Sequence, residues 1–107
     1  MIISGMMLYH SLVWSGVLLD GTWKSTDSEI KTDGKTAEFF ADKTASSAVL
    51  NILDVDDMML SRGRIVYRCE LCFERVRKDA VIIYENHGGI KLIEVTVGED
   101  SEIFLFE

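Results

Sequence analysis

The chain contains two cysteines, Cys69 and Cys72, in a C-x-x-C motif. In redox and zinc proteins this spacing works because a turn or a helix start brings the two sulfurs together. Here the motif lies within Arg64–Glu74, where apolar and polar residues alternate as in a half-buried strand. Residues three apart on a strand point to opposite faces, so we expect Cys69 in the core and Cys72 facing away from it. We therefore predict two free structural thiols in a reducing compartment, without a shared disulfide or metal.

The chain also contains two histidines, His10 and His87, which are far apart in sequence. His87 precedes Gly88-Gly89, which resembles the H-G-G of an oxyanion hole, but the chain has no G-x-S-x-G to supply the nucleophile. An acid–base pair would require the fold to bring the two histidines together. We therefore predict no catalytic residue, no metal site and no cofactor, and we expect the protein not to be an enzyme.

Acidic residues outnumber basic ones by 18 to 11, which gives a net charge of −7. This charge disfavours nucleic acid and anionic membrane surfaces as partners, because phosphate binding depends on a basic surface. It favours a basic protein partner, whose association it would accelerate, although acidic turns also serve solubility alone. The candidate partner-binding residues fall in two acidic turns and on the alternating stretch; they are Asp54, Asp56, Asp57, Glu70, Glu74, Glu99, Asp100 and Glu102.

Basic residues gather between positions 62 and 78, interleaved with acidic ones. Pairing of opposite charges across strands explains this mixture better than a phosphate site does. Together, the small size, the acidity and the free thiols favour a non-enzymatic binding protein. The specific hypothesis is an inhibitor or immunity-type protein that neutralises a basic partner such as a toxin nuclease.

The elements that must position these residues read as strands. Residues 1–19 carry no charged side chain, and Met6–Leu19 is apolar on both alternating faces, which predicts a central strand. A secretory signal would need Lys or Arg before its apolar run, and Ser, Gly and His residues dilute the stretch too much for a membrane span. We therefore expect a cytoplasmic protein.

Further strands are expected on either side of turn signals such as Asp33-Gly34 and Asn86–Gly89. The predicted strands are Thr22–Ser25, Met58–Ser61, Arg64–Glu74, Ala80–Glu85, Ile90–Val97 and Glu102–Phe106. The alternation within Arg64–Glu74 places on the outward face Arg64, Arg68, Glu70, Cys72 and Glu74.

The stretch Thr36–Leu53 fits two patterns. Its apolar residues recur at spacings of three and four, which allows a short helix within 36–50. The competing interpretation, which we favour, is two strands, Thr36–Ala41 and Ser46–Leu53. The chain as a whole predicts one all-β domain over 1–107, a small antiparallel barrel or sandwich of about eight short strands.

Three short motifs occur in succession along the first half of the chain. They are Gly21-Thr22-Trp23-Lys24, Asp33-Gly34-Lys35-Thr36 and Glu38-Phe39-Phe40-Ala41-Asp42-Lys43-Thr44. The succession resembles the small lipocalin-like domains of bacteria, in which G-T-W opens an early strand and a D-G-x-T-x-x-F segment follows. The resemblance covers Gly21–Glu107 and implies an up-and-down β-barrel with a ligand cavity. It supplies the alternative function, a lipocalin-like carrier of a small apolar ligand. Members of that family usually carry a secretion signal, which we do not expect in this chain.

Overall fold

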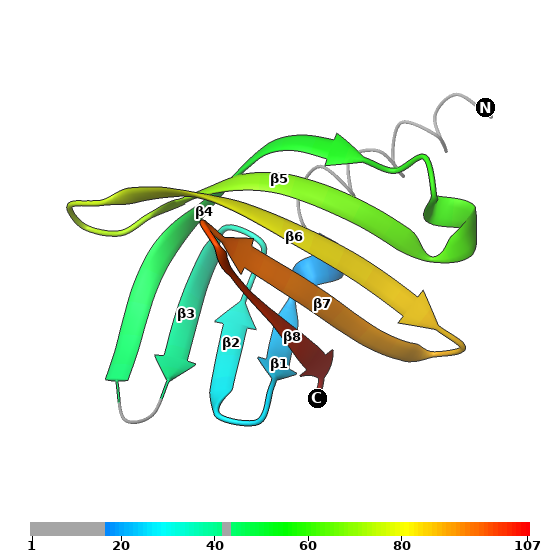
Figure 1. Cartoon of the computed structure of the whole chain (residues 1–107), viewed down its shortest axis with the longest axis horizontal. Coiled ribbons are helices and arrows are strands. Elements are labelled where there is room, and N and C mark those ends of the chain that lie inside the picture. Colours follow the sequence, from blue (N-terminus) through cyan, green and yellow to red (C-terminus); the bar gives the residue numbers. More distant parts are fainter. Residues whose placement is uncertain (1–16, 42–43) are drawn as a thin grey trace.

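The chain folds into an eight-stranded antiparallel barrel, which a computed structural model describes over residues 17–41 and 44–107 (Figure 1). The strands are β1 (Gly21–Lys24), β2 (Ser28–Thr32), β3 (Thr36–Ala41), β4 (Thr44–Asp56), β5 (Arg64–Cys72), β6 (Arg77–His87), β7 (Ile90–Val97) and β8 (Asp100–Phe106). Each strand pairs with its neighbours along the chain, and β1 also pairs with β8. The all-β prediction is confirmed, and the architecture is a barrel rather than a sandwich.

Strand β5 shows how alternation in the sequence becomes the two faces of the barrel wall. Ile65, Tyr67, Cys69 and Leu71 point inward and are fully buried. The residues between them point outward, as predicted, and range from exposed (Arg64, Arg68) to half-buried (Glu70, Cys72). The remaining inward side chains come from the other strands and include Ile30, Ala48, Leu50, Ala80, Ile82, Tyr84, Ile93, Val95 and Phe104.

The 3-10 helix η1 (Val17–Leu19) precedes β1, and it brings Leu19 into the core beside Trp23. The Trp23 indole Nε1 donates a hydrogen bond to the Leu19 carbonyl at 2.9 Å, and both side chains are buried. The Trp23 ring packs edge-on against Phe106, with 4.8 Å between centroids, and against Tyr84 at 6.3 Å. The strand predicted over Met6–Leu19 is wrong where it can be checked, since Val17–Leu19 is helical; residues 6–16 lie outside the described ranges.

Two other predictions of secondary structure were wrong. Strand β2 was missed because Ile30 is its only apolar residue, so no alternation is visible there. Met58–Ser61 is not a strand: β4 continues to Asp56, and a turn with the 3-10 helix η2 (Leu60–Arg62) follows. Hydrogen bonds from Leu60 N to the Asp57 carbonyl (3.0 Å) and from Gly63 N to the Leu60 carbonyl (2.8 Å) hold this turn.

The ambiguous stretch after Thr36 forms strands β3 and β4, so the strand alternative is confirmed and the helix is not formed in its described residues. Ala37 and Ala48, which made a helix plausible, lie opposite each other on the two strands, and both face the interior. Small residues suit this position because larger neighbours already fill the space between the walls. No helix in the described part of the chain has the length and apolarity that a bilayer crossing requires.

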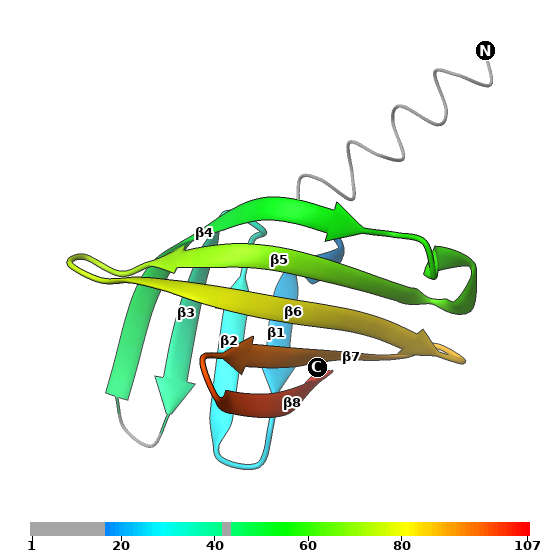
Figure 2. The same ribbon diagram turned by 45° about the horizontal axis from the view of Figure 1, so that its top comes forward.

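Closure of the barrel depends on a short contact between its first and last strands. Strand β1 has four residues, and it meets β8 in two residue pairs, Trp23 with Phe106 and Lys24 with Leu105. Figure 2 shows β1 and β8 at a steep angle to each other, and they pair only over these last residues of each strand. Gly21 lies beneath the Phe106 ring at this contact, with a positive φ of 130°. A side chain at Gly21 would displace that ring and strain the backbone, so glycine favours closure here.

We predict that Gly21→Ala lowers the free energy of unfolding by about 2–4 kcal/mol, through backbone strain and displacement of the Phe106 ring. The matched control is Gly98→Ala, which also has a positive φ but has open space around it, and which should cost about 1 kcal/mol. Urea titration followed by tryptophan fluorescence measures both. Equal losses for the two variants would contradict a special role for Gly21 in barrel closure.

Candidate functional site

Strand β8 places two carboxylates on the inner side of the barrel wall. Because side chains alternate along a strand, Asp100 and Glu102 share a face with Phe104, which is buried in the core. Ser101 and Ile103 lie on the outer face, where the Ser101 hydroxyl is 3.2 Å from that of Thr96. Asp100 and Glu102 thus occupy inward positions at the start of β8, where they would be expensive in a sealed interior.

These carboxylates are tolerated because the barrel is open beside them. Strand β1 ends at Lys24, so in the described part of the chain no strand continues along the first half of β8, and an open hollow of about 400 Å³ lies there. We call this hollow the β8 cleft. Its lining combines apolar residues from the interior with polar residues on β8: Ile30, Phe39, Val95, Val97, Phe104, Asp100, Ser101 and Glu102.

The carboxylates of the cleft are not neutralised by neighbouring cations. Among the described residues, neither Asp100 nor Glu102 forms an ion pair. Glu102 accepts one hydrogen bond, from the Ser25 hydroxyl to its Oε2 at 2.8 Å, which links β8 to the turn after β1. The cleft therefore presents negative charge beside an apolar floor, an arrangement suited to a positively charged group carried on an apolar stem.

The structure divides the eight predicted partner-binding residues into separate groups. Asp100 and Glu102 line the cleft, and Glu99 lies in the adjoining turn between β7 and β8. Asp54 and Asp56 are on β4, which three strands separate from β8 in either direction around the barrel. Asp57 follows β4, Glu70 is on the outer face of β5, and Glu74 is in the turn after β5.

The β4 carboxylates take part in local structure. Asp54 Oδ1 accepts a hydrogen bond from Val55 N, and Asp56 Oδ1 accepts one from Met58 N, both at 3.0 Å. Glu70 Oε1 lies 3.4 Å from the Cys72 sulfur on the same outer face. The eight predicted residues therefore do not form one surface.

The floor of the cleft was not predicted as part of a site. Ile30, Phe39, Val97 and Phe104 read as ordinary core residues in the sequence, because nothing marks where the wall opens. One signal was present, since Asp100 and Glu102 precede Phe104 and Phe106 at a spacing of two. That spacing puts the acidic and aromatic side chains on one face.

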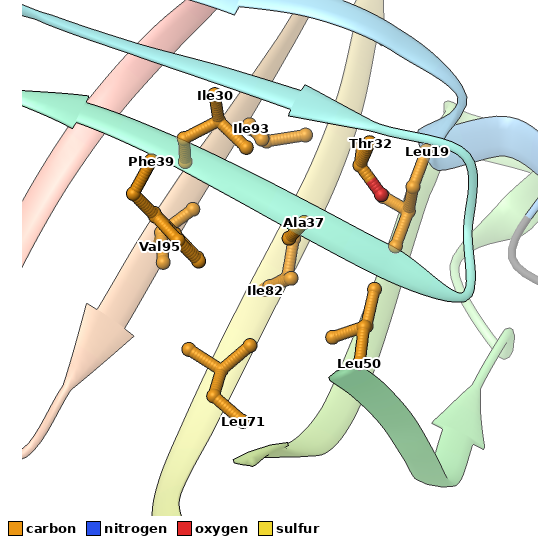
Figure 3. Close-up of a pocket in the computed structure, with 10 residues that line it drawn as sticks. All are labelled: Leu19, Ile30, Thr32, Ala37, Phe39, Leu50, Leu71, Ile82, Ile93 and Val95. Carbon is orange, nitrogen blue, oxygen red and sulfur yellow. The ribbon is translucent and has the colours of Figure 1, made fainter. Parts of the chain in front are cut away.

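A second pocket lies inside the barrel and is almost filled (Figure 3). Its open space is about 10 Å³, which is close to the minimum of about 10–15 Å³ that one water molecule needs. Thr32 supplies the one polar side chain of its lining, and its hydroxyl is engaged at the strand end, donating to the Thr36 carbonyl and accepting from Gly34 N. This pocket shares Ile30, Phe39 and Val95 with the β8 cleft, so the cleft is the outer mouth of the interior.

The cysteines lie as predicted on opposite faces of β5. Burial raises the pKa of the Cys69 thiol to about 12. The Cys72 thiol also has a raised pKa, through desolvation and then through the nearby Glu70 carboxylate. Within the described residues, no group of three or more His, Cys, Asp or Glu side chains is arranged to hold a metal ion.

His87 is the one histidine that falls within the described residues. Its Nε2 lies 2.7 Å from the Glu85 carboxylate at the exposed end of β6, and it lines neither the β8 cleft nor the interior pocket. His10 lies outside the described ranges, so the pairing of the two histidines stays untested.

Comparison with known proteins finds no matching family model, no similar curated protein and no similar solved structure. The eight-stranded barrel agrees with the fold that the resemblance to lipocalin-like domains implies.

We predict that a thiol-specific reagent at pH 8 labels Cys72 slowly and leaves Cys69 unlabelled until the protein unfolds, since raised pKa values lower the thiolate fraction. Glu70→Gln should accelerate labelling at Cys72 and leave Cys69 unchanged. Mass spectrometry of digests taken over time measures each site. Labelling of Cys69 in the folded protein at the rate of Cys72 would contradict the assigned burial.

Proposed function

We propose that this protein is a small acidic binding protein without enzymatic activity, which neutralises a basic partner protein such as a toxin nuclease. The observation that supports this proposal is the β8 cleft, where Asp100 and Glu102 share one face with an apolar floor. The net charge of −7 adds attraction at longer range, which raises the association rate of a basic partner.

The cleft adds specificity that net charge alone would lack. A lysine or arginine of the partner would lay its aliphatic stem on the floor near Phe39 and Phe104, and its charged group would reach the carboxylates. Attraction of this kind weakens at high ionic strength, because exposed charges are screened within about 10 Å at 0.1 M salt. Nucleic acid and anionic membranes are poor partners for the same surface, since both would be repelled by it.

We predict that charge reversal in the cleft, Asp100→Lys with Glu102→Lys, weakens capture of the basic partner roughly tenfold or more. The matched control is Glu38→Lys with Asp79→Lys, which makes the same change of net charge on β3 and β6, away from the β8 cleft. The measurement is quantitative affinity capture from the source cell with wild-type, cleft and control baits, followed by a salt titration of the recovered complex. Equal losses in the two variants would show that net charge alone drives binding.

A carrier of a small apolar ligand is the second candidate, favoured by the barrel fold and by the resemblance of the G-T-W region to lipocalin-like domains. Ligand pockets commonly hold about 300–1,000 Å³, far more than the roughly 10 Å³ open inside this barrel. A carried ligand would therefore occupy the β8 cleft, where the acidic rim opposes a purely apolar molecule.

We predict that an environment-sensitive apolar dye shows no saturable binding to the protein. Fluorescence titration measures this, with a lipid-carrier protein as the positive control. Saturable binding of one dye per chain, competed by an unlabelled apolar compound and abolished by Phe39→Glu, would support the carrier and contradict the proposed inhibitor function.

A further inference from the structure

Among residues 17–41 and 44–107, no strand pairs with most of the β8 edge that borders the cleft. Along its other edge, β8 pairs with β7 from Asp100 to Leu105. Along the cleft edge it pairs with β1 at Leu105 and Phe106 alone. Within the described residues, Asp100–Phe104 therefore has one free edge, and such edges are templates for pairing with another chain.

The register identifies which backbone groups point into the free edge. Glu107 N donates to the Thr22 carbonyl at 2.9 Å, and Leu105 lies opposite Lys24, so odd-numbered residues of β8 direct their backbone groups toward β1. By the alternation of an antiparallel ladder, Ser101 and Ile103 direct their N–H and C=O groups to the same side. There β1 has ended, and the chain turns back through a hydrogen bond from Ser25 N to the Ser28 carbonyl at 2.9 Å.

We infer that the free edge of β8 binds an extended basic segment of a partner protein as an added β-strand, in line with β1. This inference rests on the proposed function and specifies how the partner is held. Main-chain hydrogen bonds to Ser101 and Ile103 would supply affinity, and alternate side chains would supply selectivity. On the inner face, lysine or arginine would meet Asp100 and Glu102. On the outer face, apolar residues would pack beside Ile103 and Leu105, which are 54% and 52% exposed.

Charge selects this occupant over a second copy of the chain. Pairing of two β8 edges would bring Asp100 and Glu102 of each copy close to the same carboxylates of the other. Like charges that face each other across strands are destabilising, and inward charges are a common protection of sheet edges. A basic segment meets the same two carboxylates as opposite charges, so the feature that disfavours self-pairing favours the proposed partner.

The test uses the full-length protein and a synthetic capped peptide, Val-Lys-Val-Lys-Val, measured by isothermal titration. Two modified peptides separate backbone pairing from charge. In an antiparallel added strand, the valines lie opposite Ser101 and Ile103, so their N–H groups point toward β8. Methylation of the valine amide nitrogens therefore blocks the peptide edge that would pair with β8. Methylation of the lysine amide nitrogens blocks the opposite edge and is the matched control. We expect the valine-methylated peptide to bind roughly tenfold more weakly or worse, and the lysine-methylated peptide to bind like the parent.

A protein variant probes the same contact from the other side. Ile103→Pro removes the N–H that faces the free edge and leaves the ladder between β8 and β7 intact, a position that tolerates proline in an edge strand. Ile103→Thr keeps the N–H and serves as its control. Circular dichroism reports whether each variant folds, and the modified peptides decide the question if the proline variant does not. We expect Ile103→Pro to weaken the parent peptide roughly tenfold and Ile103→Thr to change it little.

Three other outcomes would contradict strand addition, and each can be told apart from a failure of the proposed function. Equal binding of all three peptides, lost on reversing the charges of Asp100 and Glu102, would show a charge site without strand addition and would leave the proposed function standing. Failure of every peptide to bind would reject the added strand, while the capture experiment above would still judge the function. Dimers that form with rising concentration and disappear in Ile103→Pro would assign the edge to a second copy.

Discussion

Two residue pairs close the barrel, and most of the other features of the molecule depend on them. Trp23 lies opposite Phe106 and Lys24 opposite Leu105, Glu107 N donates a hydrogen bond to the Thr22 carbonyl, and β1 ends at Lys24. The aromatic contact between Trp23 and Phe106 and the hydrogen bond from Trp23 to Leu19 both lie at the seam where the last residues of β1 and β8 meet. Along the first half of β8, no described residue pairs with the edge that faces β1, and the β8 cleft lies there.

The filled interior follows from the size of the inward side chains. Trp23, Tyr67 and Tyr84 are large side chains buried in the core, and only about 10 Å³ remains open in the interior pocket. A filled barrel behaves as a core, which contributes stability through close packing. Under the proposed binding function, a partner would therefore be recognised at the wall or the mouth, where the described residues combine apolar surface with unneutralised charge. The filled interior leaves the cleft beside β8 as an open site that combines apolar and charged residues.

The sequence predicted the parts of this structure that depend on local pattern. The alternation in β5 fixed which residues face inward and correctly separated Cys69 from Cys72. Prediction failed where one apolar residue is enough to define a strand, as for Ile30 in β2, and where spacing imitated a strand, as in Met58–Ser61. The acidity of Asp100 and Glu102 was visible in the sequence. The length of β1 decides that they border an opening, and it depends on pairing with the adjacent β2 and with β8, which is distant in sequence.

The position of these carboxylates is more informative than their number. An inward charge in a closed barrel would have to lose its hydration without compensation, so Asp100 and Glu102 are compatible with the fold only because the seam opens there. An open seam exposes a β-edge, and an exposed edge without charge would pair readily with other chains. The two features therefore depend on each other: the opening hydrates the carboxylates, and the carboxylates restrict which chains can approach the edge. A basic strand meets both conditions, because it supplies backbone partners for the edge and opposite charges for Asp100 and Glu102.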